Sequence, residues 1–121
     1  MAVKAKKEES LVLFLPKDGG RVTQLERKIR ECKEGISNYP RLHPNQHPEF
    51  REAMLVAVVA EKEILESLLG DGIVNGWAHS KAFIEEHAGG DKKKLALYAR
   101  AWCNAWEVVS DNCESGGTGL K

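Results

Sequence analysis

The residues best suited to bind a ligand are aromatic. Tyr98, Trp102 and Trp106 recur every four residues, which places them along one face of a helix, and Trp77 is a candidate neighbour. Stacked aromatic rings hold nucleobases or anchor partner proteins, although large apolar side chains at helical spacing more often belong to the core. We favour the core interpretation, and we expect Trp106, off the centre of the apolar stripe, to be the most exposed.

A second candidate is a pair of carboxylates one helical turn apart. Glu63 and Glu66 share a helix face, the arrangement with which helical nucleotide pyrophosphohydrolases hold magnesium around a triphosphate. Such a site needs a second acidic pair, and Glu85 and Glu86 are adjacent instead of one turn apart. The alternative function is therefore a nucleotide- or small-ligand-binding protein or a magnesium-dependent nucleotide hydrolase. A solvated acidic face is favoured over it.

Two histidines resemble a metal-binding pair by their spacing. His43 and His47 are four residues apart, but a proline follows each of them, which argues against the helix that would stack their rings. A zinc site would also need further ligands, such as Cys32 or His79. We interpret the pair as part of a surface loop, and the sequence assigns no metal, cofactor or catalytic residue.

A lysine run offers contacts to phosphate groups. Lys92–Lys94 would lie in the first turn of a helix, where the helix dipole disfavours positive charge. The chain as a whole carries 18 basic and 18 acidic residues, so it has no global field that attracts nucleic acid. Weak nucleic-acid binding through this run remains a second alternative.

The bulk composition is that of one globular domain. The chain has 121 residues, of which 42% are hydrophobic. Its three cysteines do not form an even set, so we expect reduced thiols, two of them buried in helices. The longest apolar run, Ala53–Ala60, is far shorter than the roughly 20 residues of a membrane span, and Leu11–Leu15 is too short for the core of a signal peptide. We expect a soluble, cytoplasmic protein without a membrane partner.

The elements that would position these residues are mostly helices. We expect an all-α or nearly all-α bundle of about four helices, with a short N-terminal strand or arm. The single domain covers residues 11–111, between a flexible tail (1–10) and a disordered tail (112–121). The expected elements are a strand at Leu11–Leu15 and helices at Arg21–Ile36, Pro48–Leu69, Asn75–His87 and about Asp91–Ser110.

Two local patterns refine the first two helices. Thr23 and Glu26 have the spacing of a capping box, while Gly35 and Pro40 predict the end of the first helix. The second helix is apolar on every side from residue 53 to 60, and Glu61, Glu63 and Glu66 follow in its second half. We expect the apolar half to be enclosed by other helices or by a second subunit, and the acidic half to meet solvent or the basic first helix.

The leading hypothesis is a non-enzymatic helical protein–protein interaction module. It would self-associate and act as an accessory, adaptor or inhibitor of another protein. The strand at 11–15 has no evident mate in the sequence, so Leu11, Leu13 and Leu15 are candidate partner-binding residues that would add to a partner's sheet. The aromatic residues of the last helix are the other candidates.

Overall fold

The computed structural model describes residues 11–42, 44–111 and 113–115 of the chain. It confirms a nearly all-α fold of four helices, to which three short strands are added. The elements are, in chain order, β1 (Val12–Phe14), α2 (Gly19–Leu42), α3 (Pro48–Asp71), β2 (Ile73–Asn75), α4 (Gly76–Ala88), α5 (Lys92–Ser110) and β3 (Glu114–Ser115).

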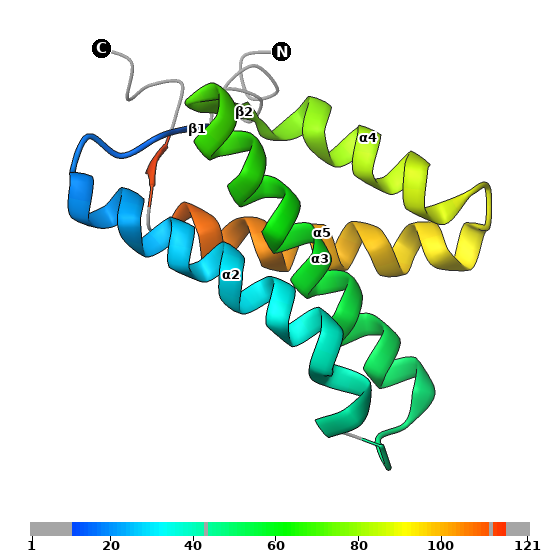
Figure 1. Cartoon of the computed structure of the whole chain (residues 1–121). Helices are drawn as coiled ribbons and strands as arrows, with labels where there is room; N and C mark the ends of the chain where they lie inside the picture. The colour runs from blue at the N-terminus through cyan, green and yellow to red at the C-terminus, as the bar shows by residue number, and fades with distance from the viewer. Residues whose placement is uncertain (1–10, 43, 112, 116–121) are drawn as a thin grey trace.

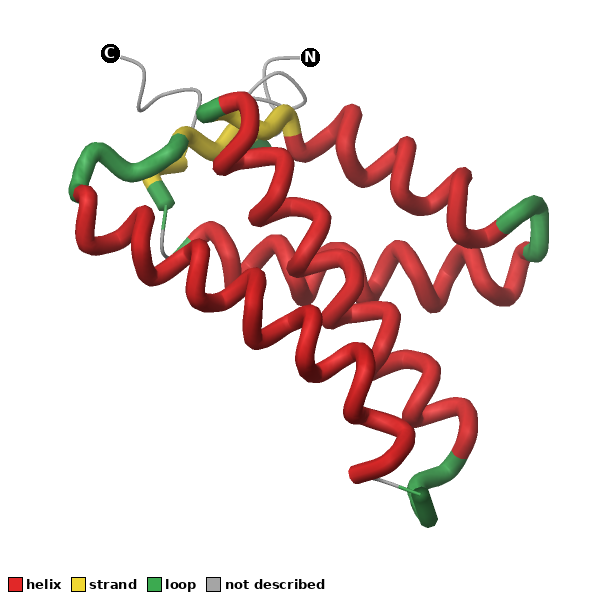
Figure 2. The backbone as a smooth tube through the Cα atoms, in the orientation of Figure 1, coloured by secondary structure: helices red, strands yellow, loops and turns green. Residues whose placement is uncertain are grey.

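The helices form two crossing layers. α2 and α3 lie side by side as a long hairpin, and α5 crosses behind them with α4 packed along it (Figure 1). The far end of the hairpin, near the loop that joins α2 to α3, projects past α5 (Figure 2). None of the helices in the described ranges has the length and apolar character needed to cross a membrane.

β1 is the central strand of a small antiparallel sheet. Its neighbours are β2, with Leu13 opposite Val74, and β3, with Phe14 opposite Glu114. The expectation that this strand lacks a mate is therefore wrong, because the turn between α3 and α4 and the segment after α5 fold onto its two edges. The expectation of disorder after residue 112 is also wrong for 114–115, whose backbone is paired in β3.

α2 begins earlier and ends later than the sequence pattern predicts. The Asp18 carboxylate accepts a hydrogen bond from the Gly20 amide, and the Thr23 hydroxyl donates to the Gly19 carbonyl inside the helix, so no capping box forms at Thr23. The helix continues through Gly35 to Leu42. The helix therefore also passes Pro40. A glycine costs a helix interior about 1 kcal/mol and a proline about 3 kcal/mol, and α2 keeps its helical form where it packs along α3.

The other three helices begin and end close to the predicted residues. His47 caps α3, with its Nδ1 accepting from the Glu49 amide, and Gly72 closes the helix with a left-handed backbone (φ 78°). Asn75 and Asp91 cap α4 and α5, each accepting from two backbone amides of the following turn. Side-chain acceptors of this kind satisfy amides that a helix leaves unpaired. Because such residues have a recognisable type, these helix boundaries can be predicted from the sequence.

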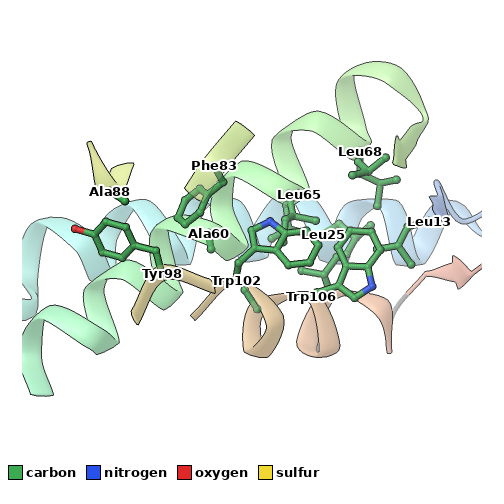
Figure 3. Close-up of a cluster of buried hydrophobic side chains, with 14 residues drawn as sticks. Leu13, Leu25, Ala60, Leu65, Leu68, Phe83, Ala88, Tyr98, Trp102 and Trp106 are labelled. Carbon is green, nitrogen blue, oxygen red and sulfur yellow. The ribbon is translucent and has the colours of Figure 1, made fainter. Parts of the chain in front are cut away.

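The core is a row of side chains along the inner face of α5. Trp102 and Trp106 stack with their ring centroids 4.9 Å apart, and Leu13, Leu25, Leu65 and Leu68 surround them (Figure 3). Phe83, Ala60, Ala88 and Tyr98 continue the row toward the start of α5. One core therefore holds both helical layers and the sheet together.

Gly76 is the point of closest approach between the sheet and this core. Its amide donates to the Leu11 carbonyl at 2.5 Å. A Cβ at this position would lie 2.5 Å from that same oxygen and 2.8 Å from Cη2 of Trp106. No side chain fits there without moving the strand or the indole.

We therefore predict that Gly76→Ala lowers the free energy of unfolding by about 1–3 kcal/mol, the usual cost of overpacking a core. Gly35→Ala is the matched control, because its Cβ would meet nothing within 4 Å in the middle of a helix, and it should raise stability by up to about 1 kcal/mol. Urea unfolding followed by circular dichroism measures both. Equal effects of the two substitutions would contradict the packing described at Gly76.

Candidate functional site

The aromatic residues predicted on the last helix form the core. Tyr98, Trp102 and Trp106 are 8%, 3% and 7% exposed, so their faces are covered by other side chains. The core interpretation is confirmed, and the expectation that Trp106 is the most exposed of them is wrong. Trp106 is covered because the missing side chain of Gly76 lets the sheet approach its ring.

Trp77 lies apart from that cluster and faces outward. Its side chain is 55% exposed, although the sequence made it a candidate neighbour of the aromatic residues of the last helix. Phe83, six residues later, is 2% exposed. On an α-helix a separation of six residues turns a side chain well away from the first one, so α4 cannot bury both residues against the same neighbour.

The predicted strand residues are mostly interior. Leu13 is fully buried, and Leu11 and Leu15 are half-buried against the core. Because β1 has a neighbour on each edge, its backbone is not open for pairing with another chain. Among the residues that the structure describes, the outer strands of the sheet are β2 and β3.

A polar cluster lies between α3 and α4. Oε2 of Glu63 is 3.5 Å from Nε2 of His87, whose Nδ1 lies 2.9 Å from the Phe83 carbonyl. The His87 ring stacks on Phe83 with centroids 4.2 Å apart. Burial raises the pKa of the Glu63 carboxyl, and the charge of His87 opposes that rise. The carboxyl and the imidazole thus connect α3 to α4 beside the buried ring of Phe83.

His79 joins the same region to α5. The indole Nε1 of Trp102 donates to Nδ1 of His79 at 3.1 Å. An indole N–H can only donate, so Nδ1 carries no proton and the imidazole is neutral. Burial lowers the pKa of His79, and a hydrogen bond with the backbone of Glu63 opposes the shift. The ring is thus a fixed, uncharged link between α3, α4 and α5.

The two predicted carboxylates turn to different neighbours. Glu66 pairs with Lys62 at 3.0 Å and with Lys33 of α2 at 3.6 Å, whereas Glu63 faces His87 of α4. In the described ranges no group of three histidine, cysteine or acidic side chains is placed to hold a metal ion. His47 caps α3, and His43 lies outside the described residues.

The three cysteines and the lysine run differ in their exposure to solvent. Cys32 is buried and donates to the Glu61 carboxylate at 3.4 Å, and burial together with that charge raises its pKa to about 12. Cys103, which we expected to be buried, is exposed because it lies on the outer side of α5. All three cysteines are free thiols. Lys92–Lys94 are exposed around the amides capped by Asp91.

The apolar segment of α3 is only partly covered by the rest of the chain. The fully buried residues of the helix, Ala60, Ile64, Leu65 and Leu68, all lie in its second half, among the glutamates. In the first half, Phe50 is 55% and Met54 is 40% exposed, and residues 55–59 are partly buried, with Val56 and Val59 packed against the core. The other helices of the chain therefore enclose residues 53–60 only in part.

A groove runs between this half of α3 and α5, and we call it the α3–α5 groove. Leu97 lies between its two hollows, of about 340 and 100 Å³. Glu49 and Glu52 flank it on the α3 side, while Lys93 and Lys94 flank it on the α5 side. Asp91, the cap of α5, also lines the first hollow beside the two lysines. The second hollow is lined by Ala53, Met54, Ala57, Arg100, Ala101 and Asn104, together with Leu97. Sequence periodicity identified the apolar segment but not the charged flanks.

Comparison with known proteins adds no family. No family model, curated protein or solved structure matches this chain. The candidate sites consequently rest on the chain's own geometry.

The bond between Trp102 and His79 generates a prediction about proton binding. Trp102→Phe removes the donor and leaves space beside the ring, so the pKa of His79 should rise toward its ordinary value of 6.5. Trp106→Phe is the control, because Trp106 is equally buried but stacks on Trp102 without bonding His79. NMR titration of the ring resonances measures the pKa in each protein.

The same lowered pKa gives a sign for the pH dependence of stability. The unfolded chain takes up the proton at a higher pH than the folded chain does, so the contribution of His79 is complete above about pH 6.5 and is lost as the pH falls. An unchanged pKa of His79 in Trp102→Phe, or an equal shift in Trp106→Phe, would contradict the assignment.

Proposed function

We propose that this chain is a helical protein–protein interaction module that self-associates through the α3–α5 groove. The observation that carries the proposal is the uneven burial along α3, where the fully buried residues all lie in the second half while Phe50 and Met54, in the first half, stay exposed. Exposed contiguous apolar surface on a small protein commonly marks an interaction site.

The apolar side chains supply the affinity in this proposal. Phe50, Met54 and Ala57 are spaced 4 and 3 residues apart, so they form one stripe along the helix. Phe50 and Met54 still expose about half of their area, and covering them would contribute on the order of 1 kcal/mol each. Aromatic and methionine side chains are also enriched at protein interfaces.

The charges on the two sides of the groove indicate that the partner is a second copy. A two-fold axis brings the same surface of each copy together. If the axis runs along the groove, the acidic flank, Glu49 and Glu52, of one copy faces the basic flank, Lys93 and Lys94, of the other. Complementary flanks of this kind fix the register of association more than they add affinity. The dimer would leave the β-sheet end of each copy available to another protein, as in an accessory, adaptor or inhibitor.

We predict that the purified chain forms dimers at micromolar concentration and that Met54→Lys weakens the dimer at least about tenfold, or 1.4 kcal/mol, because the ammonium group would lose its water. Ile73→Lys is the matched control, since Ile73 is 45% exposed on β2, away from the groove. Light scattering after size-exclusion chromatography measures the mass of each. A wild-type monomer throughout this range, or equal losses in both variants, would refute the proposal.

A charge reversal tests the two-fold arrangement separately. Glu52→Lys and Lys93→Glu should each weaken the dimer at low salt, because each places like charges across the interface. The double variant Glu52→Lys/Lys93→Glu should regain most of the wild-type affinity, and the differences should shrink as salt screens the charges. Sedimentation velocity at low and high salt measures this. A double variant no tighter than the single variants would exclude this pairing of the flanks.

A further inference from the structure

The opposite end of the molecule carries a second surface, formed by the outer edge of the sheet. The strand order β2–β1–β3 leaves β2 with a neighbour on one side only. In an antiparallel pair, alternate residues bond to the neighbour and the residues between them point their amide and carbonyl groups away. The register of β2 therefore decides which of its backbone groups are open.

The hydrogen bonds at the two ends of β2 fix that register. The Leu15 amide donates to the Gly72 carbonyl, and the Gly76 amide donates to the Leu11 carbonyl. Gly72, Val74 and Gly76 are thus the positions bonded to β1, and the N–H and C=O of Ile73 point away from it. Within residues 11–42, 44–111 and 113–115, no backbone hydrogen bond to Ile73 closes this edge.

β2 lines a hollow of about 290 Å³ between the last turn of α3 and the first turns of α4, with Asp71 and Ile73 among its walls. Ile73 is 45% exposed there, and Trp77, in the first turn of α4 just after β2, is 55% exposed. An open strand edge beside exposed large side chains is the surface that strand addition uses, with backbone bonds for affinity and alternate side chains for specificity.

The charge at this edge indicates the sequence of the segment that fits. α3 ends here with Asp71, and its last turn has no basic residue to offset the negative end of the helix dipole. The Trp77 ring adds a face that attracts cations. An extended segment with apolar residues toward Ile73 and a lysine or arginine toward Asp71 satisfies all of these groups.

We infer that the free edge of β2 binds an extended peptide segment of another protein, in which apolar and basic residues alternate, by adding it to the sheet as a fourth strand. This surface is separate from the α3–α5 groove and does not depend on self-association. The expected partner is therefore a strand-forming segment of basic character.

A random peptide library displayed on phage and selected on the immobilised full chain tests this inference. The enriched peptides should alternate β-branched or aromatic residues with lysine or arginine. A synthetic copy of the most enriched peptide is then titrated while tryptophan fluorescence is followed. Because Trp102 and Trp106 are buried and Trp77 is exposed, a change in emission reports on the β2 edge.

Three comparisons decide the outcome. Trp77→Ala should weaken the peptide at least tenfold, whereas Met54→Lys, in the α3–α5 groove, should bind it as the wild type does. Two forms of the peptide are compared, one N-methylated at its odd-numbered amides and one at its even-numbered amides; each set is called a phase. One phase should abolish binding and the other should leave it unchanged, because only one set of amides faces Ile73. The inference is overturned if no peptide is enriched, if Trp77→Ala binds normally, or if both phases of N-methylation act alike.

Discussion

The stacked indoles of Trp102 and Trp106 are the contact on which the rest of the fold depends. Trp106 fills the space that Gly76 leaves open, so the start of α4 and both β1 and β2 can close over it. Trp102 donates to His79, which ties α4 to α5 in the middle of the core. Side chains of this size bury large apolar areas, and a bundle this small has room for one such centre.

That centre determines which parts of the surface stay uncovered. It lies under the second half of α3, so Ala60, Ile64, Leu65 and Leu68 are enclosed there while the glutamates between them reach lysine or histidine partners at the edge. The first half of α3 is covered less and keeps Phe50 and Met54 in contact with solvent. At the opposite end, the sheet gains strands on both sides of β1 but leaves β2 as an edge. The two proposed surfaces, the α3–α5 groove and the β2 edge, therefore lie at the two ends of this core.

Patterns that depend on near neighbours were predictable. The starts of α3, α4 and α5 and the apolar stripe of α5 arise from bonds and contacts within a turn or two, and the predicted ranges lie close to them. One local pattern failed, because the capping box predicted at Thr23 and Glu26 does not form. The other errors of fold involve distant segments. The end of α2 was misplaced because the helix continues past Gly35 and Pro40 where it packs along α3, and the mates of β1 were missed because three-residue strands carry no periodic signal of their own.

The pattern of residues is enough to predict a nearly all-α bundle of four helices, and it contains an apolar segment at residues 53–60 that is unusual for a surface helix. The spacing of the aromatic residues of α5 fits two interpretations, a buried core and a binding face, because both place the side chains on one side of a helix. Only the tertiary structure decided between these, because burial depends on which elements meet: Trp106 is covered through Gly76, and Trp77 is not. For the same reason only the tertiary structure placed the acidic and basic flanks along one groove and turned the backbone of Ile73 outward.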